Sequence, residues 1–552
     1  MKRLIALLLS VLMILLCFAG CSGKKNGGAT DPAASTPEPT EPEGEVVLKG
    51  DELTCTVPTA DNARVFYEIF VGSFSDSNSD GIGDLRGIIN RLDYLNDGDD
   101  NSGKSLGVEG LWLTPIFRSA SYHKYDVTSF YEVDSDFGTL EDLKELVDLC
   151  HARNVKVILD LPINHTSTRN EWFLNFSNAH KEGKTDDPYY NFYSFYTQGE
   201  TAPNGRTFAA LAGTNDYYEC NFDGGMPELN FDCEGVRQAV LDVAKFYLDM
   251  GVDGFRFDAA KYIYFGDNAR SVDFWKWYLG ELRKINPEIY TVAEVWDGDN
   301  VTAQYYPALN CFNFTTSQNS GLIAATAQGG DANRFAGYLG SFLGSIKGTN
   351  PDAMYLPFIA NHDNDRCAGY LPSNNGRAQM AANLYLLCPG SPFIYYGEEI
   401  CMKGTRGSAN TDANRRLAMV WGDGDTIKDP KGTTYPSDTR ADATVAEQLE
   451  DPDSLYNYYK KVIMVRKANP EIARGEFTAL KLSGTKVGGF TSKWNGKTVC
   501  VLHNTTDSEQ TLDLKALGLD AFTVLSAVVG MNGAKIENGV LTIGAQTSVV
   551  LR

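Results

Sequence analysis

Eight short apolar segments, separated by amphipathic stretches, recur along the first four fifths of the chain. They are residues 65–70, 108–113, 155–160, 254–257, 290–293, 311–314, 356–360 and 392–395. Apolar strands that alternate with helices favour a parallel sheet, and eight such units indicate a (β/α)8 TIM barrel in the α/β class. The active site of that fold lies at the carboxyl ends of the strands, so the residues after each segment are the first candidates for chemistry.

The fourth segment, 254–257, contains Arg256, and Asp258 follows directly after the segment, two residues beyond Arg256. Side chains alternate along a strand, so these two point to the same face. A guanidinium this close favours the ionised carboxylate, which is the form that a nucleophile needs at neutral pH. We therefore predict that Asp258 is a nucleophile.

Two more acids follow later segments. Glu294 comes one repeat after Asp258 and beside Trp296; an apolar wall raises the pKa of a carboxyl group, so Glu294 is a candidate general acid. Asp363 follows the 356–360 segment in the same way. Any one such acid could simply cap the next helix, but three at strand ends predict a shared site.

The sequence Asp-Leu-Pro-Ile-Asn-His at 160–165 joins the three segments that carry Asp258, Glu294 and Asp363 and makes a set of four. In order and spacing the four segments resemble the signature regions of the alpha-amylase family, glycoside hydrolase family 13, and the resemblance extends from about residue 65 to the C-terminus. It implies a retaining glycosidase in which Asp258 is the nucleophile, Glu294 is the acid/base and Asp363 stabilises the transition state.

The resemblance also implies residues that bind the sugar. His165 and His362 match histidines beside the bond that is cut, Arg256 holds the nucleophile, and Lys261 matches a lysine on the leaving-group side. Tyr125 follows the second segment, and aromatic faces stack on sugar rings, which makes it a platform for the cleaved glucose. Trp112 reads as a packing residue.

We interpret the substrate as an α-glucan or maltooligosaccharide cut at internal α-1,4 bonds. Exo-acting α-glucosidases of the family carry an Asp where this chain has Tyr122, and its absence favours endo cleavage. An exo-acting α-glucosidase, a cyclomaltodextrinase-like enzyme and a glucanotransferase remain alternatives, as does a non-catalytic surface glucan-binding protein. Preferred chain length, tolerance of α-1,6 branches and oligomeric state stay open.

A calcium loop is predicted at 76–84, where oxygen-bearing side chains alternate and glycines allow a sharp turn. An Asp/Asn-rich turn that caps a helix at 85–95 is the alternative. The segment is similar to the calcium loop of oligo-1,6-glucosidase-like members of the family. That similarity implies a structural Ca²⁺ held by Asp76, Asn78, Asp80, the Ile82 carbonyl and Asp84.

The N-terminal residues have the layout of an export signal at 1–20, with basic residues, an apolar run too short for a membrane span, and small residues before Cys21. The Ala-Gly-Cys ending resembles a bacterial lipoprotein cleavage site. It implies a lipidated Cys21 and a cell-surface protein anchored to the membrane only by that lipid; plain secretion is the alternative. Residues 21–50 read as a disordered tether.

The remaining chain divides into three expected domains. A barrel occupies 51–165 and 234–468 and closes with a helix at 454–468. An aromatic-rich domain is inserted at 166–233. Strands with an alternating apolar pattern at 469–552 predict an antiparallel β-sandwich with a hairpin turn at Asn495-Gly496. The net charge of −22 argues against nucleic-acid binding. The other cysteines are scattered and odd in number, which favours free thiols.

Overall fold

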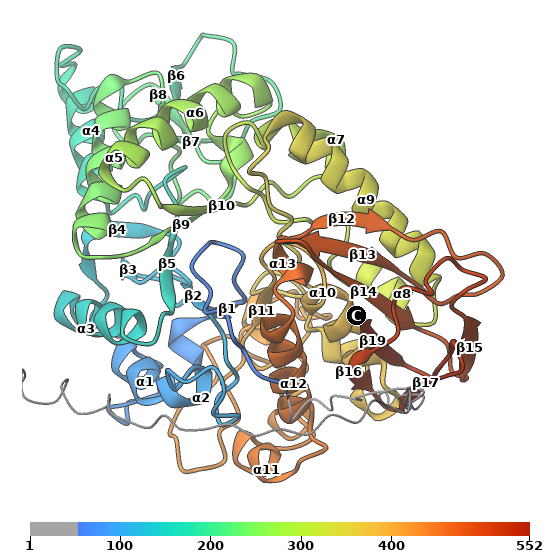
Figure 1. Ribbon diagram of the computed structural model, residues 1–552. Coiled ribbons are helices and arrows are strands. Elements are labelled where there is room, and N and C mark those ends of the chain that lie inside the picture. The colour runs from blue at the N-terminus through green and yellow to red at the C-terminus, as the bar shows by residue number, and fades with distance from the viewer. Residues whose placement is uncertain (1–52) are drawn as a thin grey trace, which may run out of the picture. The chain divides into compact units, whose positions relative to one another are not determined.

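Six parallel strands form the main sheet of the computed structural model, which describes residues 53–552 (Figure 1). Their order in the sheet is β10-β9-β5-β2-β1-β11. The bounds are β1 Phe66–Ile69, β2 Gly110–Leu113, β5 Lys156–Leu161, β9 Gly254–Phe257, β10 Tyr290–Ala293 and β11 Phe393–Tyr395. Each falls within or overlaps a segment predicted from the sequence.

Two single-residue bridges close the sheet into a barrel. Ala293 pairs in parallel with Cys311, and Phe312 pairs with Leu356. Phe393 N–H then donates to the Pro357 carbonyl at 2.9 Å, which joins this edge to β11. The (β/α)8 fold is confirmed.

The predicted strands 311–314 and 356–360 are wrong in extent, because only these bridges form. The Asn313 side chain accepts the Thr316 N–H at 2.9 Å and turns the chain. Pro357 lacks the N–H that a longer ladder needs.

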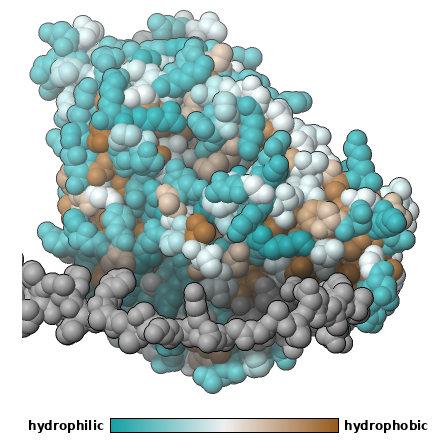
Figure 2. Space-filling view, in the orientation of Figure 1, coloured by the Kyte–Doolittle hydropathy of each residue, from teal (hydrophilic) through white to brown (hydrophobic). Residues whose placement is uncertain are grey.

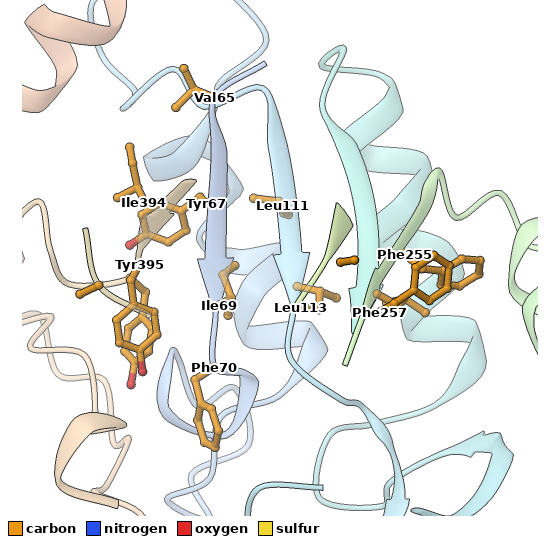
Figure 3. Packing of buried hydrophobic residues seen from close by; sticks show 14 of the residues in the cluster. Val65, Tyr67, Ile69, Phe70, Leu111, Leu113, Phe255, Phe257, Ile394 and Tyr395 are labelled. Atoms are coloured by element: carbon orange, nitrogen blue, oxygen red, sulfur yellow. The ribbon is translucent and has the colours of Figure 1, made fainter. Parts of the chain in front are cut away.

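Alternation along the strands separates two cores. Val65, Tyr67 and Ile69 point toward the surrounding helices (Figure 3), where they join the large apolar cluster. Their neighbour Phe66 points into the barrel, which a smaller cluster fills with mostly aromatic rings: Trp112, Ile158, Tyr290, Val292, Phe312, Phe314, Leu356, Phe358 and Phe393. Polar residues that continue the inward register past this plug therefore meet above it.

Helices cover the outside of the barrel (Figure 1). They are α1 Leu85–Asn90, α2 Leu92–Leu95, α3 Leu140–His151, α5 Glu234–Asp249, α6 Asn268–Ile285, α7 Asp299–Tyr305, α8 Leu322–Ala327, α9 Ala332–Thr349, α10 Arg377–Leu386, α11 Val445–Glu450, α12 Leu455–Ala468 and α13 Glu471–Arg474. Side chains cap several of them: the Ser454 hydroxyl accepts from Asn457 N–H at the start of α12. The single helix predicted at 85–95 is instead α1 and α2, which break at Arg91.

Two excursions leave the barrel. The hairpin β3 Phe117–Ser119 and β4 Val127–Val133 carries the loop that contains Tyr125. Between β5 and α5 lie α4 Glu171–Glu182 and a three-stranded antiparallel sheet of β6 Phe195–Thr197, β7 Phe208–Ala210 and β8 Asp216–Glu219. A bridge between His165 and Glu228 ties this region to the end of β5.

The C-terminal residues form two antiparallel sheets (Figure 1, red). One has the order β12-β13-β14-β19-β16 and the other β15-β18-β17. Their bounds are β12 Glu476–Ala479, β13 Gly488–Trp494, β14 Lys497–Asn504, β15 Gln510–Asp513, β16 Leu525–Gly530, β17 Ala534–Glu537, β18 Val540–Ile543 and β19 Thr547–Leu551. An apolar cluster that includes Leu502, Leu541 and Val549 packs between them, and the turn residues Asn495 and Gly496 have φ of 48° and 78°.

The face seen in Figure 2 is mainly hydrophilic, with single apolar residues scattered over it. The described part of the chain contains no helix long and apolar enough to cross a membrane. Within it all nine cysteines are free, and only Cys233 is not fully buried. The predicted export signal, the tether and Cys21 lie outside the described residues.

Candidate active site

One buried guanidinium joins three acids at the carboxyl ends of the strands. Arg256, with no exposed side-chain surface, places Nη1 2.7 Å from Asp160 Oδ1 and 2.6 Å from Asp258 Oδ1. Its Nη2 lies 3.1 Å from Glu294 Oε2, although the contact is not aligned as a hydrogen bond. The strand register explains the meeting, because Arg256 pairs with Asp160 on one side and with Val292, two residues before Glu294, on the other.

Glu294 is a buried carboxyl group close to other acids. Burial, together with two neighbouring carboxylates, raises the pKa of Glu294 to about 7, although Arg256 acts in the opposite direction. The carboxylate Oε2 also accepts the Ala259 N–H at 2.9 Å. Ala259 has a φ of 48°, in the left-handed region that a residue with a Cβ adopts at a cost. This turn directly after Asp258 aims the N–H at Glu294.

Asp363 is held by His362 and Arg416. His362 Nε2 lies 3.0 Å from Asp363 Oδ2, and Arg416 Nη2 lies 2.8 Å from Oδ1. Burial by itself would raise the pKa of Asp363, but His362 and Arg416 hold it well below its usual range. Asp363 therefore stays ionised, and 28% of its side-chain surface is exposed to solvent.

Tyr125 and His165 complete the wall around the acids. The Tyr125 hydroxyl contacts Asp160 Oδ2 at 2.9 Å and His362 Nε2 at 2.6 Å, and its ring lies nearly parallel to that of His362. His165 is 2% exposed, and among the described residues neither of its ring nitrogens has a hydrogen-bond partner. An imidazole that is left unsatisfied near Asp258 has the donor and acceptor that a sugar hydroxyl requires.

Lys261 lies beside this centre and is tied to the loop after Glu294. Its Nζ donates to the Trp296 carbonyl at 2.8 Å and to Asp297 Oδ2 at 3.1 Å. Trp296 is 41% exposed and stacks on Phe314 with centroids 4.9 Å apart, while Phe222 is 46% exposed and packs near His165. Lys261 therefore braces one exposed aromatic side of the site.

Two site residues escaped the sequence analysis. Arg416 lies far along the chain, in a loop with no recognisable motif, and only folding brings it to Asp363. Glu68 on β1 contacts His362 Nδ1 at 2.5 Å and is 1% exposed. A signal for Glu68 was present, since it is the only charged residue in the apolar run 65–71. Trp112, read as a packing residue, is 1% exposed.

The predicted calcium residues lie on one loop between β1 and α1. Asp76 Oδ1 accepts the N–H groups of Asn78 and Ser79 at 3.1 and 2.8 Å, and Asp76 Oδ2 accepts from Gly81 N–H and the Thr426 hydroxyl at 2.7 Å each. Asp84 caps α1 by accepting the Gly87 N–H at 2.6 Å. No cluster of three or more His, Cys, Asp or Glu side chains arranged for a metal occurs in residues 53–552. The fold therefore brings the side chains onto one turn, and calcium binding stays a prediction.

Comparison with known proteins agrees with this geometry. Residues 68–475 match the family model described as "Alpha amylase, catalytic domain". The chain is 33% identical to "Alpha-amylase 3" of Dictyoglomus thermophilum, covering 88% of this chain and 93% of that one. It is 30% identical to a "4-alpha-glucanotransferase" of Thermotoga maritima, covering 75% and 89%.

Among solved structures the fold is similar to that of Amy13B from Eubacterium rectale. The TM-score is 0.82 and the identity 34%, covering 91% of this chain and 97% of that one. The match of family model, length and fold coincides with three acids at the strand ends. The chain is therefore a member of the alpha-amylase family of glycosidases, glycoside hydrolase family 13.

Proposed function

We propose that the protein hydrolyses internal α-1,4-glucosidic bonds of starch or maltooligosaccharides with retention of configuration. The observation that carries the retaining mechanism is the shared Arg256 guanidinium, which contacts Asp258 at 2.6 Å and Glu294 at 3.1 Å. Both acids thus face the same bond, and a retaining pair needs its carboxyl groups only about 5–5.5 Å apart.

In the first step Glu294 protonates the glycosidic oxygen while Asp258 attacks the anomeric carbon, which gives a β-glucosyl ester and releases the leaving chain. In the second step Glu294, now ionised, removes a proton from water, and the water breaks the ester. Asp363 supports the first step as a carboxylate that accepts from sugar hydroxyls, while its other contacts to His362 and Arg416 fix its position.

Cleavage inside a chain, and not at its end, is supported by Tyr122. Its hydroxyl accepts from Arg416 Nη1 at 3.3 Å, and its ring packs near Phe70. A tyrosine here offers no carboxylate to grip the end of a glucan. The exposed Trp296 and Phe222 provide apolar faces on which further sugar units can stack.

The test is the product pattern from maltoheptaose blocked at its non-reducing end, with Asp258→Asn as the inactive control. We expect internal fragments with the wild-type protein and none with the variant. An intact substrate would refute endo cleavage. Unblocked maltoheptaose would then separate an exo-acting enzyme, which gives short products, from a binding protein, which gives none. Products longer than the substrate would indicate a glucanotransferase.

We also propose that the 76–84 loop binds a structural Ca²⁺. The support is its donor chemistry: carboxylate and amide oxygens stand at alternate positions, and the loop contains no Lys or Arg. Hard oxygen ligands on a tight loop are what Ca²⁺ selects. The ion would sit at the start of α1, away from Asp258, and would stabilise the fold without entering the reaction.

For localisation we propose export followed by lipid attachment at Cys21. The support is the sequence alone, with basic residues, a short apolar run and Ala-Gly-Cys in that order. A lipid anchor and the following polar tether would keep the enzyme at the cell surface, where large glucans are accessible.

A further inference from the structure

Glu68 is a buried carboxylate with a single polar partner among the described residues. Its Oε1 lies 2.5 Å from His362 Nδ1 and 3.3 Å from the His362 backbone N. Glu68 is 1% exposed and His362 is fully buried, so water does not solvate either group. A buried charge is costly unless it is paired. One proton must therefore lie between these two side chains, either on the carboxylate or on the imidazole.

The other ring nitrogen of His362 fixes which groups donate. Tyr125 OH lies 2.9 Å from Asp160 Oδ2, and Asp160 is itself paired with Arg256, so the hydroxyl donates to that carboxylate. The Tyr125 oxygen then accepts from His362 Nε2 at 2.6 Å. Asp363 Oδ2, 3.0 Å from the same nitrogen, also only accepts. Nε2 therefore carries a hydrogen.

The two arginines near His362 are already paired with acids other than Glu68. The groups that face the Glu68–His362 pair are Asp363, Tyr125, Asp160, Tyr395, Arg256 and Arg416, with the Trp112 ring roughly perpendicular to the imidazole. Arg256 is shared by acids on β5, β9 and β10, and Arg416 contacts Asp363. Neither arginine forms an ion pair with Glu68, so His362 is the cation available to it.

We propose that Glu68 is a positioning residue that keeps His362 doubly protonated, so that a charged imidazolium holds Asp363 and Tyr125 in place during glycoside cleavage. The relay runs from β1 through His362 to the carboxylate that meets the sugar. The proposal rests on the glycosidase chemistry of the family and does not depend on whether cleavage is internal or terminal.

The pKa of His362 agrees with the geometry, whereas burial raises the pKa of Glu68 and His362 acts in the opposite direction. Burial would lower the pKa of His362, but the carboxylates of Asp363 and Glu68 raise it to about 10. Without Glu68 the balance moves toward burial, and the pKa of His362 falls. At a pH above the new value the imidazole is neutral. A neutral imidazole has one N–H, so it then cannot donate both toward residue 68 and toward Asp363.

The kinetic test uses Glu68→Gln, which removes the charge and keeps the size. The substrate is α-maltotriosyl fluoride, because fluoride leaves without the proton of Glu294, and kcat/KM reports the first step. Relative to wild type we expect a loss of no more than about 3-fold near pH 5 and of at least about 10-fold near pH 8. A loss that is absent or equal at all pH values would overturn the proposal.

Two variants serve as controls. Glu68→Asp retains the charge and should restore the wild-type shape of the pH profile. Glu399→Gln removes another buried carboxylate. Glu399 accepts hydrogen bonds from the Tyr67 and Tyr94 hydroxyls at 2.5 and 2.6 Å and forms none with the acids of the site. It should leave the profile unchanged in shape. A pH-dependent loss in Glu399→Gln as large as in Glu68→Gln would contradict a specific role for Glu68.

A second measurement needs no variant of Glu68 and no turnover. The chain has six histidines, so ¹⁵N-histidine labelling gives a simple NMR spectrum, assigned with His362→Gln. We expect both nitrogens of His362 to show the shifts of protonated nitrogen at neutral pH and up to about pH 9. A bare Nδ1 or Nε2 at neutral pH would overturn the proposal even if Glu68→Gln fails to fold.

Discussion

Arg256 Nη2 and Glu294 Oε2 lie 3.1 Å apart inside the barrel without an aligned hydrogen bond. Arg256 therefore attracts Glu294 by charge, while the hydrogen bond to Oε2 comes from the Ala259 N–H at 2.9 Å. Asp258, in contrast, accepts a hydrogen bond from Arg256 Nη1 at 2.6 Å. One guanidinium thus forms a hydrogen bond with Asp258 and only an unaligned ionic contact with Glu294, which suits the proposed roles of nucleophile and proton donor.

Replacement of the two acids should separate their roles. We expect Asp258→Asn to lower kcat on maltooligosaccharides by about 10,000-fold or more, because no ester can form. Glu294→Gln should lower kcat/KM on the same substrates by about 100- to 10,000-fold, as expected for loss of a general acid.

The distinguishing measurement for this pair is α-maltotriosyl fluoride, whose leaving group needs no proton. Glu294→Gln should recover most of its first-step rate on this substrate, seen as a burst of fluoride, whereas Asp258→Asn should not. Equal behaviour of the two variants would show that the roles are assigned wrongly. Circular dichroism of both variants controls for folding.

The pH profile should report Glu294. Its pKa is raised to about 7, so the acid is protonated below that pH and loses its proton as the pH rises past it. We expect kcat/KM on maltooligosaccharides to fall along an alkaline limb centred near pH 7. On α-maltotriosyl fluoride this limb should weaken or vanish. An identical limb with both substrates would assign it to another group.

Calcium should stabilise the protein through the 76–84 loop. An ion present at about 100 times its dissociation constant adds about 2.7 kcal/mol to the free energy of unfolding, which chelation removes. We expect EDTA to lower the Tm by a few degrees and added Ca²⁺ to restore it. Asp80→Asn keeps the acceptor for Ile82 N–H and should abolish the effect, whereas the exposed Asp186→Asn should not. A Tm that does not change with EDTA or Ca²⁺ would refute the binding of a structural Ca²⁺ by this loop.

Gly390 should be intolerant of any side chain. It has a φ of 86°, and a Cβ there would lie 2.0 Å from the Tyr355 carbonyl oxygen. Strain and overlap together should make Gly390→Ala cost about 3 kcal/mol or more of the free energy of unfolding. The matched control is Gly280→Ala on α6, where nothing lies within 4 Å; this change should stabilise the helix by about 0.5–1 kcal/mol. Urea unfolding of both variants measures the difference.

Lipid attachment should depend on one sulfur atom. We expect the wild-type protein to fractionate with membranes and Cys21→Ser to be released, since the thiol carries the lipid. Metabolic labelling with a tagged fatty acid should mark only the wild type. If both proteins fractionate alike and neither is labelled, the anchor is refuted, and secretion without a lipid becomes the better description.

Local patterns in the sequence predicted the barrel and the positions of its acids. Apolar segments followed by Asp258, Glu294 and Asp363 are local patterns, and a parallel barrel necessarily gathers the ends of its strands at one face. Local signals also predicted a helix at 454–468, observed as α12, and the turn at Asn495-Gly496, where φ is positive.

How those acids are charged and held depends on contacts between segments that lie far apart in the sequence. Two of the eight predicted strands are single bridges, because the Asn313 side chain accepts the Thr316 N–H and turns the chain, and because Pro357 has no N–H for a longer ladder. Arg416 reaches Asp363, and Glu68 reaches His362, across more than 50 and nearly 300 residues of sequence. Burial and the distance between charges set the state of an acid, and both depend on which distant segments pack together, which no local pattern records.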